Sequence, residues 1–385
     1  MRRLVLLVGA IVLVDMLFYG AITPLLPELS RELGLGKNAA GVLTGAYAAG
    51  TLLGSLPAGW LTARFGVRPT VVVGMALMGV SSLAFAFADD IVMLDAARFL
   101  QGVGSACSWA AGMAWLAAGA PPERRGEVLG TAMGVAIFGV QLGPVLGAVA
   151  TWTGREVAFS SAVLLGVVLA GLAWATPGPA AAAPAPASPA AALRDRSILK
   201  GMWLTALGGA GLGLVNVLEP LRLDALGAGA LVVGATFFAA GGMEALVNPV
   251  VGRLTDRSGM RVLVPAALLA CAVALVVLRL PGTVLGVAIA VVAAVGLFGV
   301  LWVPAVGLLM EGAERVGLDH GFAFALFMLA WAAGVTVGSV GGGTLAEATG
   351  DGVPYALLAG LFGLSALWAT GRARARPAAA DRLPA

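Results

Sequence analysis

Histidine, cysteine and lysine are nearly absent from this chain. His320 is the only histidine, and the two cysteines, Cys107 and Cys271, stand alone inside apolar segments. A zinc site needs several Cys or His ligands at short spacing, and a disulfide framework needs an even set of spaced cysteines. The sequence therefore predicts neither a metal site nor a disulfide.

Motifs for catalysis and for nucleotide binding are also missing. No glycine-rich loop ends in Gly-Lys-Ser/Thr, which phosphate binding by ATPases would require. The single histidine offers no Ser-His-Asp arrangement for hydrolysis. The net charge of +3 is too small and too scattered for a nucleic-acid groove. We therefore expect no enzyme, no ATP-driven pump, no cofactor and no nucleic-acid partner.

Charged residues are scarce, and apolar residues are abundant. Only 11% of the residues are charged and 60% are hydrophobic, whereas about 25% are charged in an average soluble protein. A chain of this composition needs the lipid bilayer as its solvent. Arginine supplies all but two of the 23 basic residues, which indicates a GC-rich genome. We expect a multi-pass protein of the bacterial cytoplasmic (inner) membrane.

Long apolar runs fill the sequence. A membrane-spanning helix needs about 20 mostly apolar residues, and by this measure the chain has twelve candidate spans. They lie near 4–26, 39–61, 70–88, 91–118, 127–151, 157–176, 201–222, 230–251, 261–280, 283–310, 320–346 and 353–370. The first run continues past Tyr19 without a small-residue cleavage site, so we interpret it as a retained span and not as a secretory signal.

The distribution of basic residues predicts the orientation. If the N-terminus is cytoplasmic, 17 of the 23 Lys and Arg residues fall in cytoplasmic segments, in agreement with the positive-inside rule. Both termini are then cytoplasmic, as an even number of spans requires.

A ten-residue pattern occurs twice. Residues 59–68 and 252–261 share Gly, Leu, Thr, Arg, Gly and Arg at an offset of 193 residues, about half of the chain. The sequence therefore predicts two similar halves, which in membrane proteins are typical of transporters. We divide the chain into a six-helix half (1–176), a Pro- and Ala-rich cytoplasmic linker (177–199), a second six-helix half (200–371) and a short basic tail (372–385).

Three motifs carry a resemblance to a known family. The loop at 59–68 resembles the G-x-L-a-D-r-x-G-r-r motif, and residues 98–104 (RFLQGVG) resemble R-x-x-Q-G. Residues 139–147 (GVQLGPVLG) resemble the span-five motif g-x-x-x-G-P-x-x-G-G, with Ala148 in place of the last glycine. On these residues the chain resembles the major facilitator superfamily, and within it the twelve-helix drug:proton antiporters. The resemblance implies two six-helix halves, each of two inverted three-helix repeats.

The resemblance also implies conformational roles. It assigns them to Gly59, Arg64, Gly66, Arg68, Gly139, Gly143, Pro144, Gly147, Gly252, Asp256, Arg257 and Arg261. In the family, an acid in the loop motif helps a cytoplasmic charge latch to hold the outward-open state. Ala63 stands at that position in the first copy, whereas the second copy keeps Asp256.

Glycines repeat every four residues in the fifth span. This spacing places Gly139, Gly143 and Gly147 on one helical face, and Pro144 favours a kink there. The eleventh span has a similar series, with Ser339 where the proline would be. Ordinary close packing of helices explains the spacing as well as a special role does.

Ionisable residues inside spans are costly and therefore functional candidates. Asp15 lies near mid-membrane in the first span and shares a helical face with Tyr19. We expect it to carry a proton or bind a cation; the alternative is a buried acid paired with a neighbouring donor. Glu244 lies equally deep in the eighth span and is a second candidate for a proton or substrate carboxylate.

Two further charged residues are candidates for proton coupling. Glu219 precedes Pro220 near the outer end of the seventh span, where water could simply solvate it. The resemblance implies a proton-coupling role for Arg98, which lies inside the fourth span. Asp95, three residues earlier on the same helix, is a local alternative partner for its guanidinium.

Polar and aromatic residues at mid-span are candidates for a substrate cavity, although packing explains many such residues. The set comprises Tyr19, Gln101, Trp109, Gln141, Asn216, Phe237, Trp302 and Trp331.

These observations predict a monomeric secondary transporter that works by alternating access. The preferred hypothesis is export of a small lipophilic or cationic compound in exchange for protons. Proton symport or uniport of a metabolite into the cell is the alternative. A channel or a membrane-embedded enzyme fits the glycine- and proline-broken helices and the missing catalytic residues less well.

Overall fold

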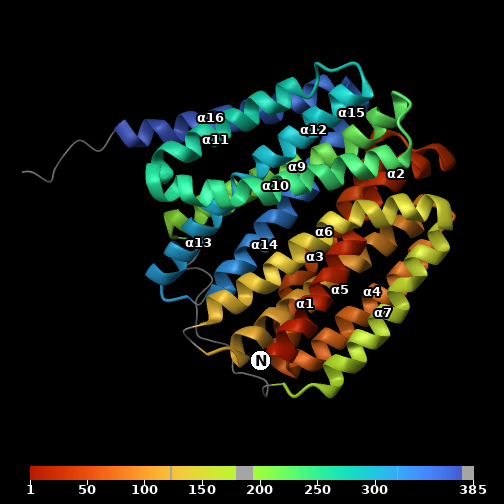
Figure 1. Cartoon of the computed structure of the whole chain (residues 1–385), viewed down its shortest axis with the longest axis vertical. Coiled ribbons are helices and arrows are strands. Elements are labelled where there is room, and N and C mark those ends of the chain that lie inside the picture. The colour runs from red at the N-terminus through yellow and green to blue at the C-terminus, as the bar shows by residue number, and fades with distance from the viewer. Residues whose placement is uncertain (122–123, 179–193, 319, 375–385) are drawn as a thin grey trace, which may run out of the picture.

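The computed structural model describes residues 1–121, 124–178, 194–318 and 320–374, with side chains described for all of these except 255–258, 261, 320–322 and 371–374. In the described ranges the chain forms helices joined by short turns, without a β-strand. Figure 1 shows two helical bundles side by side, the first coloured red to yellow-green and the second green to blue. The predicted all-helical membrane fold is therefore confirmed.

The first bundle consists of α1 (Arg2–Gly20), α2 (Ile22–Glu32), α3 (Lys37–Phe65), α4 (Val67–Ala86), α5 (Ile91–Gly119), α6 (Arg125–Thr153) and α7 (Arg155–Ala175). The second consists of α9 (Arg196–Ala225), α10 (Ala230–Ser258), α11 (Met260–Val277), α12 (Val284–Gly299), α13 (Trp302–Arg315), α14 (His320–Thr336), the π-helical segment η2 (Val337–Gly341), α15 (Gly342–Thr349) and α16 (Gly352–Arg374). Most of the predicted linker, residues 179–193, lies outside the described residues, as does the end of the predicted tail.

The helices account for the twelve predicted spans. Ten segments of the described chain are long and apolar enough to cross a membrane. The 29-residue helix α5 and the shorter apolar segment Val262–Val277 within α11 occupy the two remaining predicted positions.

Three of the spans are interrupted, which the hydropathy pattern did not predict. The first breaks at Ala21 between α1 and α2, the tenth at Val300–Leu301 between α12 and α13, and the eleventh widens into η2. Proline has no amide hydrogen, so Pro24 and Pro304 each remove a helical hydrogen bond at the first two breaks. The first span also continues to Glu32, beyond its predicted end at residue 26.

The second half begins earlier than predicted, because Asp195 caps its first helix. Its carboxylate accepts hydrogen bonds from the amides of Ser197 (2.8 Å) and Ile198 (3.1 Å), so α9 starts at Arg196. Partial burial raises the pKa of Asp195, but these amides and the Arg315 guanidinium hold it below its ordinary value overall. At the other end, α16 continues to Arg374, into the predicted tail.

The glycine series on α6 lets this helix touch the backbone of α1. A Cβ atom added at Gly143 would lie 2.5 Å from the Gly20 Cα and 2.9 Å from the Leu17 carbonyl oxygen. A Cβ at Gly139 would collide with the backbone of Leu13 in the same way. Ordinary close packing, the simpler explanation of the spacing, therefore accounts for this face.

The second half repeats this packing between α14–η2 and α9. Gly334 lies against the Ala206 carbonyl, and Gly338 against that of Ala210. Leu13 corresponds to Ala206, and Leu17 to Ala210, at the same offset of 193 residues as the loop motif. The two halves therefore share not only a loop but also a helix-packing register.

Glycine 143 allows a direct test of this packing. Because its Cβ would overlap backbone, Gly143→Ala should lower the free energy of unfolding by about 1–3 kcal/mol. Gly134 is on the same helix with open space around it, so Gly134→Ala should raise the stability slightly, by about 0.5–1 kcal/mol. Thermal unfolding of both variants in detergent checks the prediction, and equal melting temperatures would contradict it.

Candidate functional site

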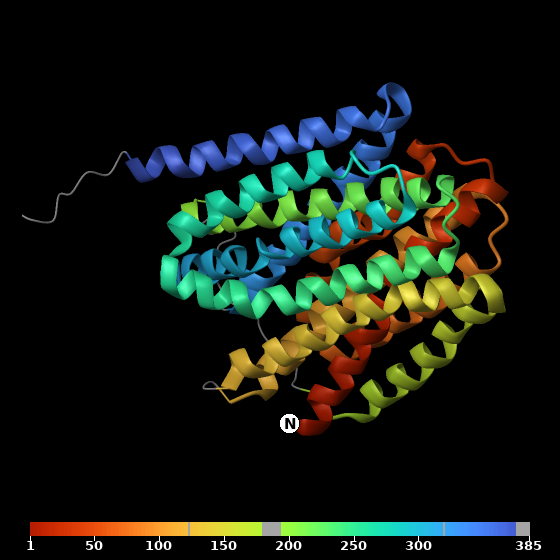
Figure 2. The same ribbon diagram turned by 45° about the horizontal axis from the view of Figure 1, so that its top comes forward.

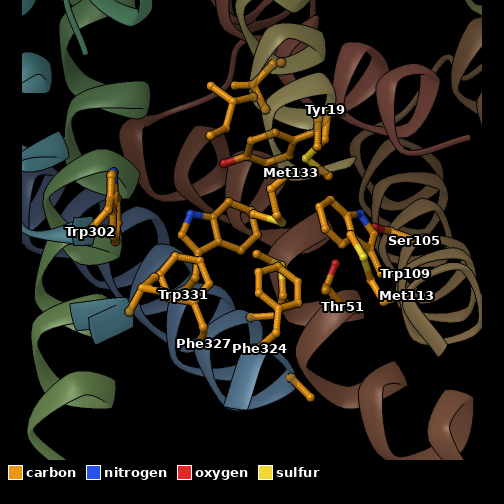
Figure 3. Close-up of a pocket in the computed structure, with 18 of the residues that line it drawn as sticks. Tyr19, Thr51, Ser105, Trp109, Met113, Met133, Trp302, Phe324, Phe327 and Trp331 are labelled. Carbon is orange, nitrogen blue, oxygen red and sulfur yellow. The ribbon is translucent and has the colours of Figure 1, made fainter. Parts of the chain in front are cut away.

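A cavity of about 1120 Å³ lies between the two halves. Its walls come from α1, α2, α3, α5 and α6 of the first half and from α9, α10, α12, α13 and α14 of the second. It extends to the end of the bundle that holds the N-terminus, where Ala118, Arg125 and Leu318 line it. Figure 3 shows the rings of Tyr19, Trp109, Phe324 and Trp331 gathered around its centre.

The opposite end of the molecule is closed by contacts between the halves. Gly41 of α3 lies against the backbone of Ser339 and Gly343. Polar bonds surround this contact. They join Arg31 to Asp224, Lys37 to Asp351 (2.5 Å), and Thr344 to Asn38 (2.8 Å). The cavity therefore has one open and one closed end.

Asp15 lies directly behind the cavity wall, and only 1% of its surface is exposed. Its carboxyl group accepts hydrogen bonds from the Tyr47 hydroxyl (3.0 Å), the Ser105 hydroxyl (2.6 Å) and the Trp109 indole (2.9 Å). All three donors belong to the first half, and Ser105 and Trp109 also line the cavity. The predicted mid-membrane acid is therefore a well-satisfied group one side chain away from the cavity.

Arg98 is fully buried and holds the break in the first span. Its guanidinium donates to the carbonyl oxygens of Phe18 and Tyr19 (both 3.1 Å) and to the Gln101 side chain (2.9 Å). It also lies over the Tyr47 ring, 5.1 Å from the centroid. The local alternative partner, Asp95, is not among these acceptors, and its Oδ1 has no hydrogen-bond partner.

Glu244 lines the cavity from the second half. It sits at the middle of α10, half-buried, and its carboxyl group lies beside the Trp302 indole. Its side chain rests on Gly299, the last residue of α12, where any Cβ would displace it. The break between α12 and α13 therefore lies immediately beside this acid.

Glu219 is placed elsewhere. It is buried in the second half, bonded to the Tyr355 hydroxyl and 3.8 Å from the Arg222 guanidinium, and it is not part of the cavity wall. The simpler expectation, that water solvates Glu219 at the end of its span, is therefore wrong, because the residue is buried between these partners. Its role in proton coupling stays a prediction.

Comparison with known proteins now identifies the family. A sequence model described as the Major Facilitator Superfamily matches residues 8–318. The chain belongs to the Major Facilitator Superfamily. It is therefore a multi-pass membrane protein of a transporter family, as expected, and the family match points to no enzyme.

Individual relatives match only part of the chain. The human synaptic vesicular amine transporter is 38% identical over 125 residues, 32% of this chain and 24% of that protein. The MFS-type transporter ppzB of Metarhizium rileyi is 32% identical over 163 residues, 40% of this chain and 34% of that protein. The chain thus aligns with between a quarter and a third of these relatives' length. A crystal structure of a D-xylose-proton symporter superposes with a TM-score of 0.74 at 19% identity, covering 96% and 97% of the two chains, which shows a shared fold.

Seven of the eight residues that the sequence analysis predicted for the substrate cavity line it in the structure. They are Tyr19, Trp109, Gln141, Asn216, Phe237, Trp302 and Trp331. Gln101 does not: it binds Arg98 and donates to Ser82 at 2.8 Å behind the wall. The position of the other seven is now clear, but substrate binding by them stays a prediction.

Several important residues escaped the sequence analysis. Met113, Met133 and Met328 line the cavity, and Phe324 stacks on Trp109 with centroids 5.7 Å apart. The sequence did hold a signal for two of them. Phe324 and Met328 are four residues apart, and Met328 and Trp331 are three apart, so all three share one helical face. Tyr47, the third donor to Asp15, gave no signal from spacing, because only the fold brings it to the first span.

The structure describes only part of the superfamily's loop motif at 59–68 and 252–261. Gly66 ends α3 with φ of 90°, and Gly259 has φ of 72° in the second copy, so both copies need glycine at this turn. Gly59, Arg64 and Gly252 are on the periphery, and Arg68 packs beside Gly178. The side chains of Asp256, Arg257 and Arg261 lie outside the described residues.

Arg98→Lys tests the bond that holds the first span's break. An ammonium lacks the planar fork that reaches both carbonyls and Gln101 at once, so at least one acceptor should lose its donor, at about 1–3 kcal/mol of stability. Arg124→Lys is the matched control, because Arg124 makes only an exposed ion pair with Glu127. Thermal unfolding should separate the two variants; equal stability would show that Arg98 does not hold the break.

Proposed function

We propose that the chain is a proton-coupled antiporter that exports a small lipophilic or cationic compound from the bacterial cytoplasm. The supporting observation is the placement of Asp15, a buried carboxyl group whose donor Trp109 is itself part of the cavity wall. Protonation of Asp15 would change its hydrogen bond with Trp109 and so affect the cavity wall that the substrate would contact.

Alternating access of the two halves is the proposed transport cycle. With the N-terminus in the cytoplasm, the cavity opens to the cytoplasm and the bonds at Arg31, Lys37 and Asn38 close the outer end. The described conformation is then inward-open. The outward-open state requires these bonds to break and the halves to meet at the cytoplasmic end.

Trp109 supplies the physical coupling. It donates to Asp15 within the first half and stacks on Phe324 of the second. A protonated carboxyl group has one proton to donate and fewer acceptor sites, so protonation weakens its hold on the indole. The stacking contact between the halves would then depend on the proton carried by Asp15.

The cavity suits a lipophilic cation. Tyr19, Trp109, Trp331 and Phe324 present aromatic faces, which attract cations as well as apolar groups. Glu244 adds a carboxylate to the wall. The human relative, a synaptic vesicular amine transporter, agrees with this class of substrate.

Uptake is the competing proposal. The D-xylose-proton symporter shares the fold of this chain but shows nothing more, so the direction of transport has to be measured. An open channel is disfavoured by the closed outer end.

Asp15→Asn should abolish the proton exchange. In everted vesicles that contain the wild-type protein and are energised by respiration, a pH-sensitive dye should report proton release from the lumen when substrate is added. The variant should give no release, because an amide cannot carry the proton. Asp89→Asn, a change to an exposed acid, should leave the signal unchanged. If the Asp15 variant is folded and still exchanges protons, the proposal is wrong; proton uptake into the lumen on substrate addition would instead indicate symport.

Cross-linking the closed end should stop transport. The native cysteines are buried, so Asn38→Cys and Thr344→Cys together create an exposed pair at the contact between the halves. A short bifunctional thiol reagent, or oxidation, should block transport, and cleavage of the link should restore it. Each single variant is the control. Continued transport by fully cross-linked protein would rule out opening at this end.

A further inference from the structure

The wall around Glu244 contains hydrogen-bond acceptors that the protein leaves without donors. Asn248 lies one turn after Glu244 on the same face of α10 and also lines the cavity. Its Oδ1 is buried and has no partner in the described structure. A buried acceptor without a donor costs free energy, and here the donor has to come from the contents of the cavity, water or a ligand.

The two cavity acids differ in how far they are satisfied. Asp15 already receives three donors. Glu244 has one donor group nearby, the Trp302 indole, while an ionised carboxyl group has room for about four donors. Donors from a ligand can therefore bind at Glu244 without displacing protein bonds, whereas at Asp15 they would have to compete.

The Glu244 side chain is held in position. It rests on Gly299 at the helix break and lies beside the Trp302 indole. From the first half, Gln141 lies against Gly241, one turn before Glu244. Among the described lining residues Arg125 is the one cation, and it lies at the cavity mouth with its Nε on the Ala117 carbonyl. No positive side chain of the described wall therefore neutralises Glu244.

We propose, on the basis of the function proposed above, that Glu244 and Asn248 form the recognition site for a protonated primary or secondary amine. The ammonium would donate one N–H to the Glu244 carboxylate and another to the Asn248 Oδ1, with its apolar part against the aromatic rings. The site would disfavour quaternary ammonium compounds, which have no N–H to give. Asp15 would then bind the transported proton, and Glu244 would bind the substrate.

Three probes of the same shape test this site. They are 2-(1-naphthyl)ethylamine, its N,N,N-trimethyl derivative and 2-(1-naphthyl)ethanol. Their affinities are measured by calorimetry on the full chain in lipid nanodiscs at neutral pH. The primary amine should bind at least about tenfold more tightly than the trimethyl compound, because hydrogen bonds to a charged group are worth about 1.5–3 kcal/mol.

Variants locate the binding group. Glu244→Gln and Asn248→Ala should each weaken binding of the amine by about tenfold or more, with little change for the neutral alcohol. Retained alcohol binding shows that the variants are folded. Asp15→Asn should bind the amine nearly as well as wild type, and Glu156→Gln, a change to an exposed acid, serves as the matched control.

Three results would overturn the inference. They are equal or tighter binding of the trimethyl compound, loss of amine binding in Asp15→Asn but not in Glu244→Gln, and absence of binding by the amine. The function proposed above fails separately, when wild-type vesicles show no proton movement while equilibrium binding at Glu244 persists. The binding and proton-release measurements thus distinguish a wrong site from a wrong transport mode.

Discussion

The bilayer interior has no water to satisfy polar groups, and this constraint organises the centre of the molecule. Arg98 is buried where helix α1 breaks, and the carbonyls near the break are the acceptors it needs. The same guanidinium lies over Tyr47, which donates to Asp15, and Asp15 in turn holds Trp109. One connected set of bonds therefore runs from a helix break to the wall of the cavity.

Glycine supplies the second constraint. Without a hydrophobic drive between helices in lipid, α6 and α14 associate with α1 and α9 through direct backbone contact. Such contact tolerates almost no change of shape, which favours each half as a rigid unit. Contacts between the halves include direct backbone contact too, at Gly41 and Gly234, but also polar bonds at Asn38 and Lys37, which can exchange with water. These exchangeable bonds favour motion of one half against the other over deformation within a half.

Hydropathy was enough to predict the helices and their order, because lipid forces each span to be long and apolar, and the duplicated loop motif predicted the repeat. Hydropathy could not locate the breaks at Ala21 and Val300, since a proline stops a helix only when neighbouring groups take over the freed carbonyls. The acids were visible as costly residues, but their partners were not. Asp95 is the neighbour of Arg98 in sequence, whereas two of its three acceptors come from residues about 80 positions away. The four methionines of the wall, Met16, Met113, Met133 and Met328, resemble any packing residue until the cavity is known.

The repeat explains why the two acids differ. At the offset of 193 that relates α1 to α9, Asp15 corresponds to Gly208, and Trp109 corresponds to Trp302 at the same offset. Each tryptophan contacts the corresponding position of its own half. Trp109 donates to Asp15, and the Trp302 ring lies 2.9 Å from where a Gly208 Cβ would be. With no acid at Gly208, the Trp302 indole lies instead beside Glu244 on the neighbouring helix α10. The same tryptophan position thus faces an acid behind the wall in one half and an acid on the wall in the other. Because only the second can meet a ligand without losing protein donors, divergence of a symmetric fold would be sufficient to separate the proposed proton site from the proposed substrate site.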